Sequence, residues 1–279
     1  MEKILLALDA RNIHTNTVDF ACYIANLTQS RLTGVFLENL LADERPVLQA
    51  TTPGASFQDR NPALVTSQTQ PAGSTEDNIR TFKESCQCRS VSAFTHRDRG
   101  VPLEEMVEES RFADLVIIDP DTSFSRKNEA IPGRFVKDVL QEAECPVIIA
   151  PYSFESIDTI IFAYNGSTSS VFAIKQFTYL FPQLRQKKII VVNVRSKEEP
   201  AIEQQFKMKE WLRQHYTDME FKILTGDPSD ELFGFLIEKK NSIVVMGAYG
   251  RSMPSRLLKP SHARLIVKTV NLPIFIAHP

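Results

Sequence analysis

Two patterns of apolar residues alternate along the chain, most clearly in its second half. Short runs of consecutive apolar residues predict buried strands, and apolar residues that recur every three to four positions predict amphipathic helices. The predicted strands are 160–163, 188–194, 221–224, 242–246 and 273–277. The predicted helices are 169–181, 201–216, one that begins after Asp227-Pro228, and 261–270.

This alternation of strand and helix predicts a parallel sheet covered by helices on both faces. Asp227 can cap the helix that follows it, and Pro228 suits a first helical turn. In such sheets ligands bind beyond the carboxyl ends of the strands, where the winding reverses. The loops after the first and fourth strands are therefore where a site is expected.

The chain also repeats itself. Segment 2–9 parallels 158–165, and the apolar run 113–118 parallels 241–246. Near the end of each copy, Cys145-Pro146-Val147-Ile148-Ile149 parallels Leu272-Pro273-Ile274-Phe275-Ile276. We interpret the chain as two diverged copies of one fold, 1–152 and 157–279, joined by a short linker at 151–156.

The offset between the copies falls from 156 residues at their first strands to 126 at the Gly-x-Pro segments 100–102 and 226–228. The first copy therefore holds about 30 extra residues between its second and third strands. They fall in segment 42–78, which is rich in Pro, Thr, Ser, Gln, Ala and Gly. This composition predicts a long or partly disordered loop within the first copy.

Composition narrows the functional classes. With 43% hydrophobic and 24% charged residues, the 279-residue chain has the balance of a globular protein. A net charge of −2 gives no electrostatic footprint for nucleic acid or an anionic membrane. The apolar run 4–8 is too short for a secretory signal, so we expect a cytoplasmic protein. The four cysteines are expected to be free thiols.

The loop after the fourth strand of the second copy carries the candidate chemistry. Gly247 and Gly250 let the backbone approach a phosphate closely, and Ser261 opens the last predicted helix, whose N-terminus favours anions. Cationic residues surround this loop: Arg251, Arg256, Lys259 and Arg264. The pattern predicts a phosphate-binding loop.

This loop resembles the ATP-binding loop of the universal stress protein family, which reads Gly, two residues, Gly, nine residues, then Gly-Ser/Thr. Gly247, Gly250 and Ser261 match at the right spacing. Pro260 replaces the third glycine and removes one N–H donor. Asn165 stands where the family has Asp, and the following Gly166-Ser167 matches. The resemblance covers nearly the whole chain in strand order.

The resemblance implies two tandem copies of a doubly wound α/β fold of the adenine-nucleotide α-hydrolase-like type. Each copy would hold a five-stranded parallel sheet of order 3-2-1-4-5. It further implies a stress-response protein that binds ATP, with or without magnesium, in its second copy and acts by regulated protein interaction. The implied nucleotide-binding residues are Asn165, Gly166, Met246, Gly247, Gly250, Arg251, Ser261 and His262. Homodimerisation through the final strands, 147–150 or 274–277, is expected from the family.

The first copy lacks both glycines, and Asp119 and Asp121 stand where phosphates would lie, near Asp9 at the end of strand one. These carboxylates would repel a triphosphate, so we predict that the first copy binds no ATP and pairs with the second. An alternative is a cation site made by the three carboxylates. The spacing of His14, His96, His215 and His278 matches no metal motif.

Two other functions remain open. The glycines could be turn residues and Ser261 a helix cap, in which case the protein is an interaction scaffold that binds no nucleotide. An enzyme of the wider nucleotide α-hydrolase group is disfavoured, because segment 165–170 only faintly echoes a catalytic phosphate motif. No hydrolase or transferase motif is present, so we assign no catalytic residue and expect at most slow ATP hydrolysis.

Overall fold

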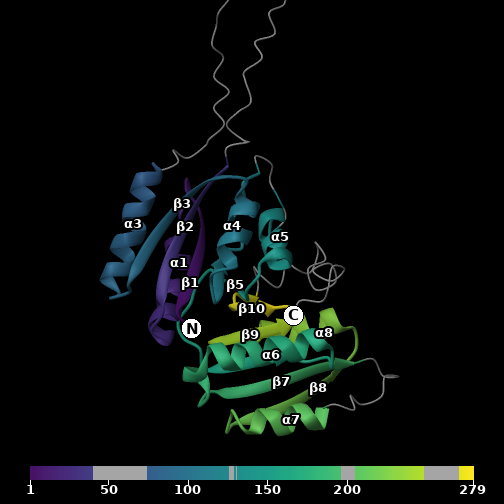
Figure 1. Ribbon diagram of the computed structural model, residues 1–279. Coiled ribbons are helices and arrows are strands. Elements are labelled where there is room, and N and C mark those ends of the chain that lie inside the picture. The colour runs from purple at the N-terminus through teal and green to yellow at the C-terminus, as the bar shows by residue number, and fades with distance from the viewer. Residues whose placement is uncertain (40–73, 126–128, 130, 196–204, 248–269) are drawn as a thin grey trace, which may run out of the picture.

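One ten-stranded sheet runs through the whole computed structural model (Figure 1). The structure describes residues 1–39, 74–125, 129, 131–195, 205–247 and 270–279. The strands are β1 (Lys3–Asp9), β2 (Arg31–Asn39), β3 (Ala93–Gly100), β4 (Leu115–Ile118), β5 (Val147–Ile149), β6 (Thr159–Ala163), β7 (Lys188–Arg195), β8 (Met219–Thr225), β9 (Ser242–Gly247) and β10 (Ile274–Ala277). The α-helices are α1 (Thr15–Thr28), α3 (Thr75–Cys88), α4 (Pro102–Ser110), α5 (Arg134–Glu142), α6 (Thr168–Leu180), α7 (Gln205–Arg213) and α8 (Pro228–Ile237), and Pro182–Leu184 forms a 3-10 turn, η1.

The sheet consists of two halves with the same winding. Its strand order is β3-β2-β1-β4-β5-β10-β9-β6-β7-β8, so each half reads 3-2-1-4-5 from its outer edge to the centre. Among the ten named strands, pairing is parallel within each half and antiparallel between β5 and β10. The predicted tandem fold and strand order are confirmed, and the first copy pairs with the second as expected.

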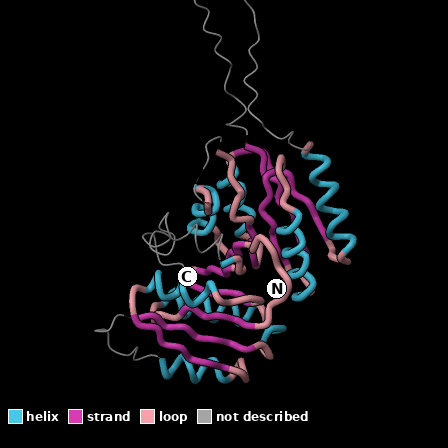
Figure 2. The backbone as a smooth tube through the Cα atoms, turned by 180° about the vertical axis from the view of Figure 1, so that it is seen from behind, coloured by secondary structure: helices cyan, strands magenta, loops and turns pink. Residues whose placement is uncertain are grey.

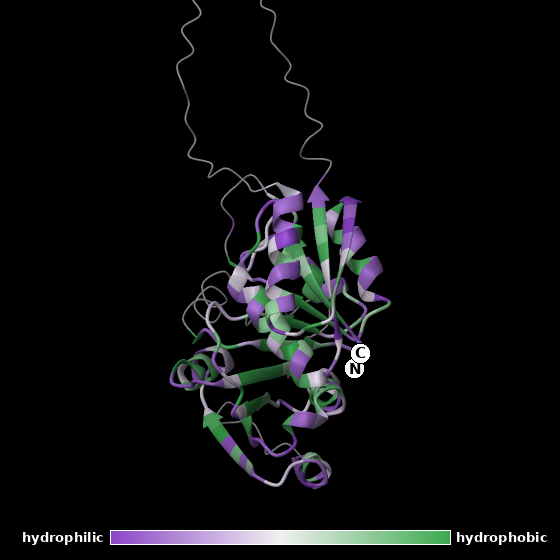
Figure 3. Ribbon diagram, turned by 90° about the vertical axis from the view of Figure 1, so that its left-hand side faces the viewer, coloured by the Kyte–Doolittle hydropathy of each residue, from purple (hydrophilic) through white to green (hydrophobic). Residues whose placement is uncertain are grey.

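Helices cover both faces of the sheet (Figure 2). Helices α1, α3, α6 and α7 contribute residues to one buried apolar cluster, and α4, α5 and α8 contribute to the other. The central strands are apolar, whereas the edge strands β3 and β8 carry charged residues, and the helices are apolar mainly on their inner side (Figure 3). This is the pattern of a sheet buried on both faces. None of the helices within the described ranges is long and apolar enough to cross a membrane.

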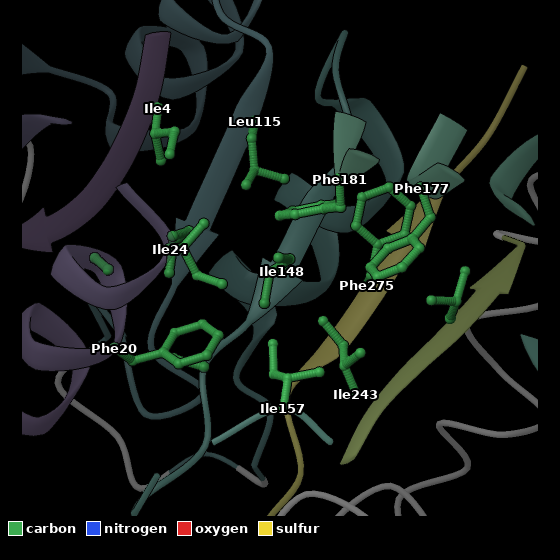
Figure 4. Close-up of a cluster of buried hydrophobic side chains, with 14 of the residues drawn as sticks. Ile4, Phe20, Ile24, Leu115, Ile148, Ile157, Phe177, Phe181, Ile243 and Phe275 are labelled. Atoms are coloured by element: carbon green, nitrogen blue, oxygen red, sulfur yellow. The ribbon is translucent and has the colours of Figure 1, made fainter. Parts of the chain in front are cut away.

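The seam between the halves is a packed apolar core. Phe275 on β10 is fully buried and its ring centroid lies 5.3 Å from that of Phe177 and 6.2 Å from that of Phe181, both from the second half. Leu115 and Ile148, which belong to the first half, and Ile157 lie in the same cluster as these rings (Figure 4). The two copies therefore share one continuous core across the seam.

The segment between β5 and β6 packs tightly. The Phe154 ring contacts Phe20 and Tyr23 of α1 at centroid distances of 4.9 and 4.6 Å. The backbone N–H groups of Tyr152 and Ser153 both donate to Asn271 Oδ1, at 2.7 and 3.2 Å. Because this segment is bound to both halves, the boundaries 1–152 and 157–279 stay a prediction.

The predicted strands and helices of the second half are confirmed where the structure describes them, and Asp227 caps α8 as expected by accepting from Ser229 N and Asp230 N. Helix α7 ends at Arg213, before the predicted end at residue 216. The next residues form closing turns: Gln214 N donates to Trp211 O, and His215 N and Tyr216 N both donate to Leu212 O. The predicted segments 201–204 and 261–269 lie outside the described residues.

One prediction is wrong. The loop was expected to extend to residue 78, but α3 begins at Thr75 because Ser74 caps it by accepting from Asp77 N. Residues 42–73 of that loop lie outside the described residues. Strands 147–150 and 274–277 offer no free edge for dimerisation, because β5 and β10 pair with each other on one side and with β4 and β9 on the other.

Truncating the seam tests this architecture. Phe275→Ala removes a fully buried ring and should lower the free energy of unfolding by about 3–5 kcal/mol, as seen for large-to-small changes in cores. The control is Phe112→Ala, whose side chain is 69% exposed and whose loss should cost less than about 0.5 kcal/mol. Urea unfolding followed by circular dichroism measures both, and equal losses would contradict the packing.

Candidate functional site at the carboxyl ends of the strands

The two halves place equivalent residues at equivalent positions beyond the sheet. Ala7 pairs with Ile118 in the first half, as Ala163 pairs with Met246 in the second. The residues that follow are therefore equivalent: Asp119 matches Gly247. By the same register Asp9 matches Asn165. In each half, one of these positions follows the first strand and the other follows the fourth strand. Each pair therefore lies where the winding of its half reverses.

In the second half, the β6–α6 turn is built from short polar residues. Asn165 is exposed, and its Oδ1 accepts the Ser167 backbone N–H at 3.1 Å. Gly166 has φ +79°, a conformation that favours glycine. Ser167 caps α6, its hydroxyl accepting from Ser170 N at 3.2 Å. The turn thereby presents the N-terminus of a 13-residue helix at this edge of the sheet.

Gly247 lies against the start of that helix. A Cβ atom at position 247 would come within 2.4 Å of the Ser169 carbonyl carbon and 2.6 Å of Ser170 N, so only glycine fits. Of the predicted nucleotide-binding residues, the structure thus brings Asn165, Gly166, Met246 and Gly247 to one edge. The other four, Gly250, Arg251, Ser261 and His262, lie outside the described residues, as does Pro260.

Tyr164 is a residue at this edge that sequence reasoning missed. It is 2% exposed, and its hydroxyl has no hydrogen-bond partner among the residues that the structure describes. Its backbone carbonyl accepts from Asn193 Nδ2 at 2.8 Å, and burial raises the pKa of its phenol. The signal in the sequence is a phenol at the end of an aliphatic strand, where the first copy has Leu8.

In the first half, the equivalent place is filled by Asp119. Its Oδ2 is 2.9 Å from His14 Nδ1 and also accepts a hydrogen bond from the Thr17 hydroxyl. Its Oδ1 accepts the Asp121 backbone N–H at 2.8 Å. His14 is the N-cap residue of α1, so the Asp119 carboxylate lies at the N-terminus of that helix. The chain thus supplies its own anion at this position.

The charges of this group are mutually dependent. Burial alone would raise the Asp119 pKa, but the hydrogen bonds from His14 and Thr17 outweigh it and hold the pKa below its usual value. The hydrogen bond to Asp119 raises the pKa of His14. Burial raises the pKa of Asp9, which lies nearby. Asp119 and His14 therefore form an ion pair in which each side chain favours the charged form of the other.

The space that remains beside Asp119 is a cavity of about 40 Å³, lined by Asp9, His14, Thr17, Asp119 and Asp121 among others. That is room for one or two water molecules, whereas ligand pockets span roughly 300–1,000 Å³. Among the described residues, no group of three or more His, Cys, Asp or Glu is arranged to hold a metal ion. The cation site considered for Asp9, Asp119 and Asp121 is therefore not formed, because Asp119 is engaged by His14 and Thr17.

The sequence predicts no metal-binding role for His14 and assigns it no other. Its role could have been recognised from two features of the sequence together. It directly precedes the helix that follows strand one, and an acidic residue follows strand four. Parallel strand ends meet at one edge of the sheet, which brings these two positions together.

Solved structures of other proteins share this fold over nearly their whole length. A universal stress protein from Archaeoglobus fulgidus DSM 4304 superposes with a TM-score of 0.68 at 14% identity, over 99% of this chain and 96% of that one. The fold is that of the universal stress proteins, in tandem. A functionally unknown protein from Pseudomonas aeruginosa PAO1 has a TM-score of 0.58 at 14% identity, over 100% and 92% of the two chains. No family model and no curated protein matches the sequence.

Within this universal stress fold, the His14–Asp119 pair predicts a pH-dependent stability. The raised His14 pKa contributes stability that is full below the ordinary value of 6.5 and is lost as pH rises through the raised value. The lowered Asp119 pKa contributes stability that is full above 3.8 and is lost as pH falls through the lowered value. The pair therefore stabilises most between about pH 4 and pH 6.5.

His14→Ala should lower the free energy of unfolding by about 1 kcal/mol at pH 5.5, discounted for the half-exposed histidine, and by less at pH 9. His14 makes no side-chain cap bond, so the substitution removes the pair and leaves the cap unchanged. Urea unfolding at the two pH values measures the difference. An equal loss at both would show that the ion pair is not the cause.

Proposed function

We propose that the chain is a nucleotide-responsive interaction protein that binds ATP in its second half, with the first half as a structural partner. The observation that carries this proposal is the difference between two equivalent positions. Asp119 fills the anion position at the N-terminus of α1, and Gly247 leaves the same position beside α6 without a carboxylate.

The N-terminus of α6 suits a phosphate group. Its first backbone N–H groups carry partial positive charge, and its first turn contains no acidic residue. The Ser167 and Ser169 hydroxyls lie 3.3 Å apart at the same end and can donate to phosphate oxygens. The exposed Asn165 amide and the Tyr164 hydroxyl, which no described residue binds, add polar groups with capacity for a nucleoside.

The remaining ligand groups come from the sequence. Gly250 and Ser261 follow β9 with the spacing of the family's ATP loop, and Arg251 and His262 are their neighbours in sequence. Magnesium binds ATP mainly through the phosphates and retains several waters, and the described second-half edge offers Asn165 as an oxygen donor but no carboxylate. Magnesium would therefore be held chiefly by the nucleotide.

The same edge is poorly equipped for catalysis. The described residues at this edge, 164–170 and 246–247, include no carboxylate and no histidine to act as a general base. ATP hydrolysis there should be slow, and binding energy would instead bias the interaction of the protein with a partner.

A second function, an interaction scaffold without nucleotide, has one observation in its favour. Gly247 is required by its close approach to the Ser169 backbone, which accounts for this glycine without any phosphate. Pro260, which lacks the N–H of the family's glycine, points the same way.

Ser167→Asp distinguishes the two functions. Aspartate caps helices as well as serine does, so α6 should stay intact, but the added carboxylate competes with phosphate, as Asp119 does in the first half. Magnesium-ATP at 100 times its dissociation constant should stabilise the wild type by about 2.7 kcal/mol, and this gain should be lost in the variant. Thermal melts with and without magnesium-ATP measure both.

The matched control is Ser74→Asp, the same substitution at the N-cap of α3. It should leave the stabilisation by ATP unchanged. Gly250→Asp, in the loop predicted from the sequence, should abolish it as Ser167→Asp does. A wild-type melting temperature that millimolar ATP leaves unchanged would favour the scaffold function.

A further inference from the structure

The outer strand of the second half, β8, ends the ten-stranded sheet. Among the described residues it pairs with β7 alone (Figure 1). Ile189 N donates to Asp218 O and Gly226 N donates to Arg195 O, so the even-numbered residues of β8 bond to β7. The N–H and C=O groups of Met219, Phe221, Ile223 and Thr225 therefore point away from the sheet, along an edge that can accept another strand.

The side chains of β8 are self-complementary about Phe221. In an antiparallel pair of two β8 strands centred on Phe221, Glu220 of each copy lies opposite Lys222 of the other, and Met219 lies opposite Ile223. Glu220 and Lys222 would form non-hydrogen-bonded pairs, in which opposing side chains approach most closely. Glu220 binds Lys188 through Oε2 at 2.9 Å, and its second carboxylate oxygen can face the partner's Lys222.

Charge also selects this register. Centring the pair on Glu220 or on Lys222 would place two like charges directly opposite each other, and centring it on Met219 would place Asp218 opposite Glu220. Among these registers, only the one centred on Phe221 places both Glu220 and Lys222 opposite a residue of opposite charge.

Apolar surface accompanies this edge. The side chains of Ile223 on β8 and Phe206 on α7 are 44% and 73% exposed, and α7 lies beside β8 (Figure 1). Lys209 of α7 lies 5.7 Å from the centre of the Phe221 ring, which ties the helix to the middle of the strand. Pairing two copies would cover apolar side chains that one copy leaves in water.

The opposite edge of the sheet differs. Strand β3 carries His96, Arg97, Asp98 and Arg99 in succession, and the two arginines bind Glu38 within the chain. Consecutive charged residues are a common protection of an edge strand against pairing. The β3 edge of the first half is therefore protected against strand pairing, whereas the β8 edge of the second half is not.

We propose that β8 is a homodimer interface, in which two copies of this chain pair antiparallel through β8 about a two-fold axis at Phe221 and extend the sheet across both molecules. A two-fold axis makes each contact occur twice, so each copy contributes both a Glu220 and a Lys222. This interface is independent of the nucleotide site, which lies at the carboxyl ends of β6 and β9.

Charge reversal tests the interface in the full-length chain. Native mass spectrometry and sedimentation velocity should give a mass twice the 31.6 kDa of one chain for the wild type at about 100 µM. Lys222→Glu and Glu220→Lys each place like charges opposite each other and should give the single-chain mass. The double variant Glu220→Lys/Lys222→Glu restores opposite charges and should restore the dimer. Arg99→Glu, at the β3 edge, is the control and should leave the mass doubled.

Amide hydrogen exchange locates the contact. The amides of Met219, Phe221 and Ile223 should exchange slowly at high concentration and faster on dilution, and the Lys222 amide, which faces β7, should not change. A single-chain mass for the wild type, a dimer that survives both single reversals, or a double variant that stays single-chain would overturn the proposal. Far-UV circular dichroism of each variant confirms that a loss of the dimer is not a loss of the fold.

Discussion

The antiparallel pairing of β5 with β10 is the contact on which the rest of the structure depends. Each half alone would expose the last strand of its sheet and the apolar side chains beside it. Pairing these strands converts two sheets into one and makes both helical layers continuous across the seam. Among the described strands it leaves β3 and β8 at the edges of the sheet, where further strand pairing can occur.

The two halves of the chain differ at one pair of equivalent positions. The same register puts Asp119 and Gly247 beside the first helix of their respective halves. In the first half the carboxylate binds His14 and Thr17 and satisfies the helix N-terminus from within. In the second half the helix approaches the strand so closely that only glycine fits. The first half thus holds a carboxylate at this position, and the second half holds none.

Much of the fold could be predicted from the sequence because buried parallel strands form short, continuous apolar runs, and the repeat showed those runs twice. Asn165, Gly166, Met246 and Gly247 were predicted as neighbours because parallel strand ends share an edge.

The His14–Asp119 pair was missed because its residues lie far apart in the chain and form no motif. Tyr164 was missed because burial, not residue type, makes its hydroxyl notable. The end of the long loop was misplaced since Ser74 was not recognised as a helix cap. The final strands were expected to mediate dimerisation by analogy with single-domain proteins, in which no second copy within the chain occupies them.

The central claim is that one half of the chain holds its own anion and the other binds a nucleotide. Its most direct test is the stoichiometry of ATP binding, measured by equilibrium dialysis with radiolabelled ATP and followed by photolabelling with an azido-ATP and peptide mapping. The account predicts one ATP per chain at saturation, with label in the peptide that contains Tyr164 to Ser170 or in the one that follows β9. Two ATP per chain, or label in the peptides that contain His14 or Asp119, would contradict it.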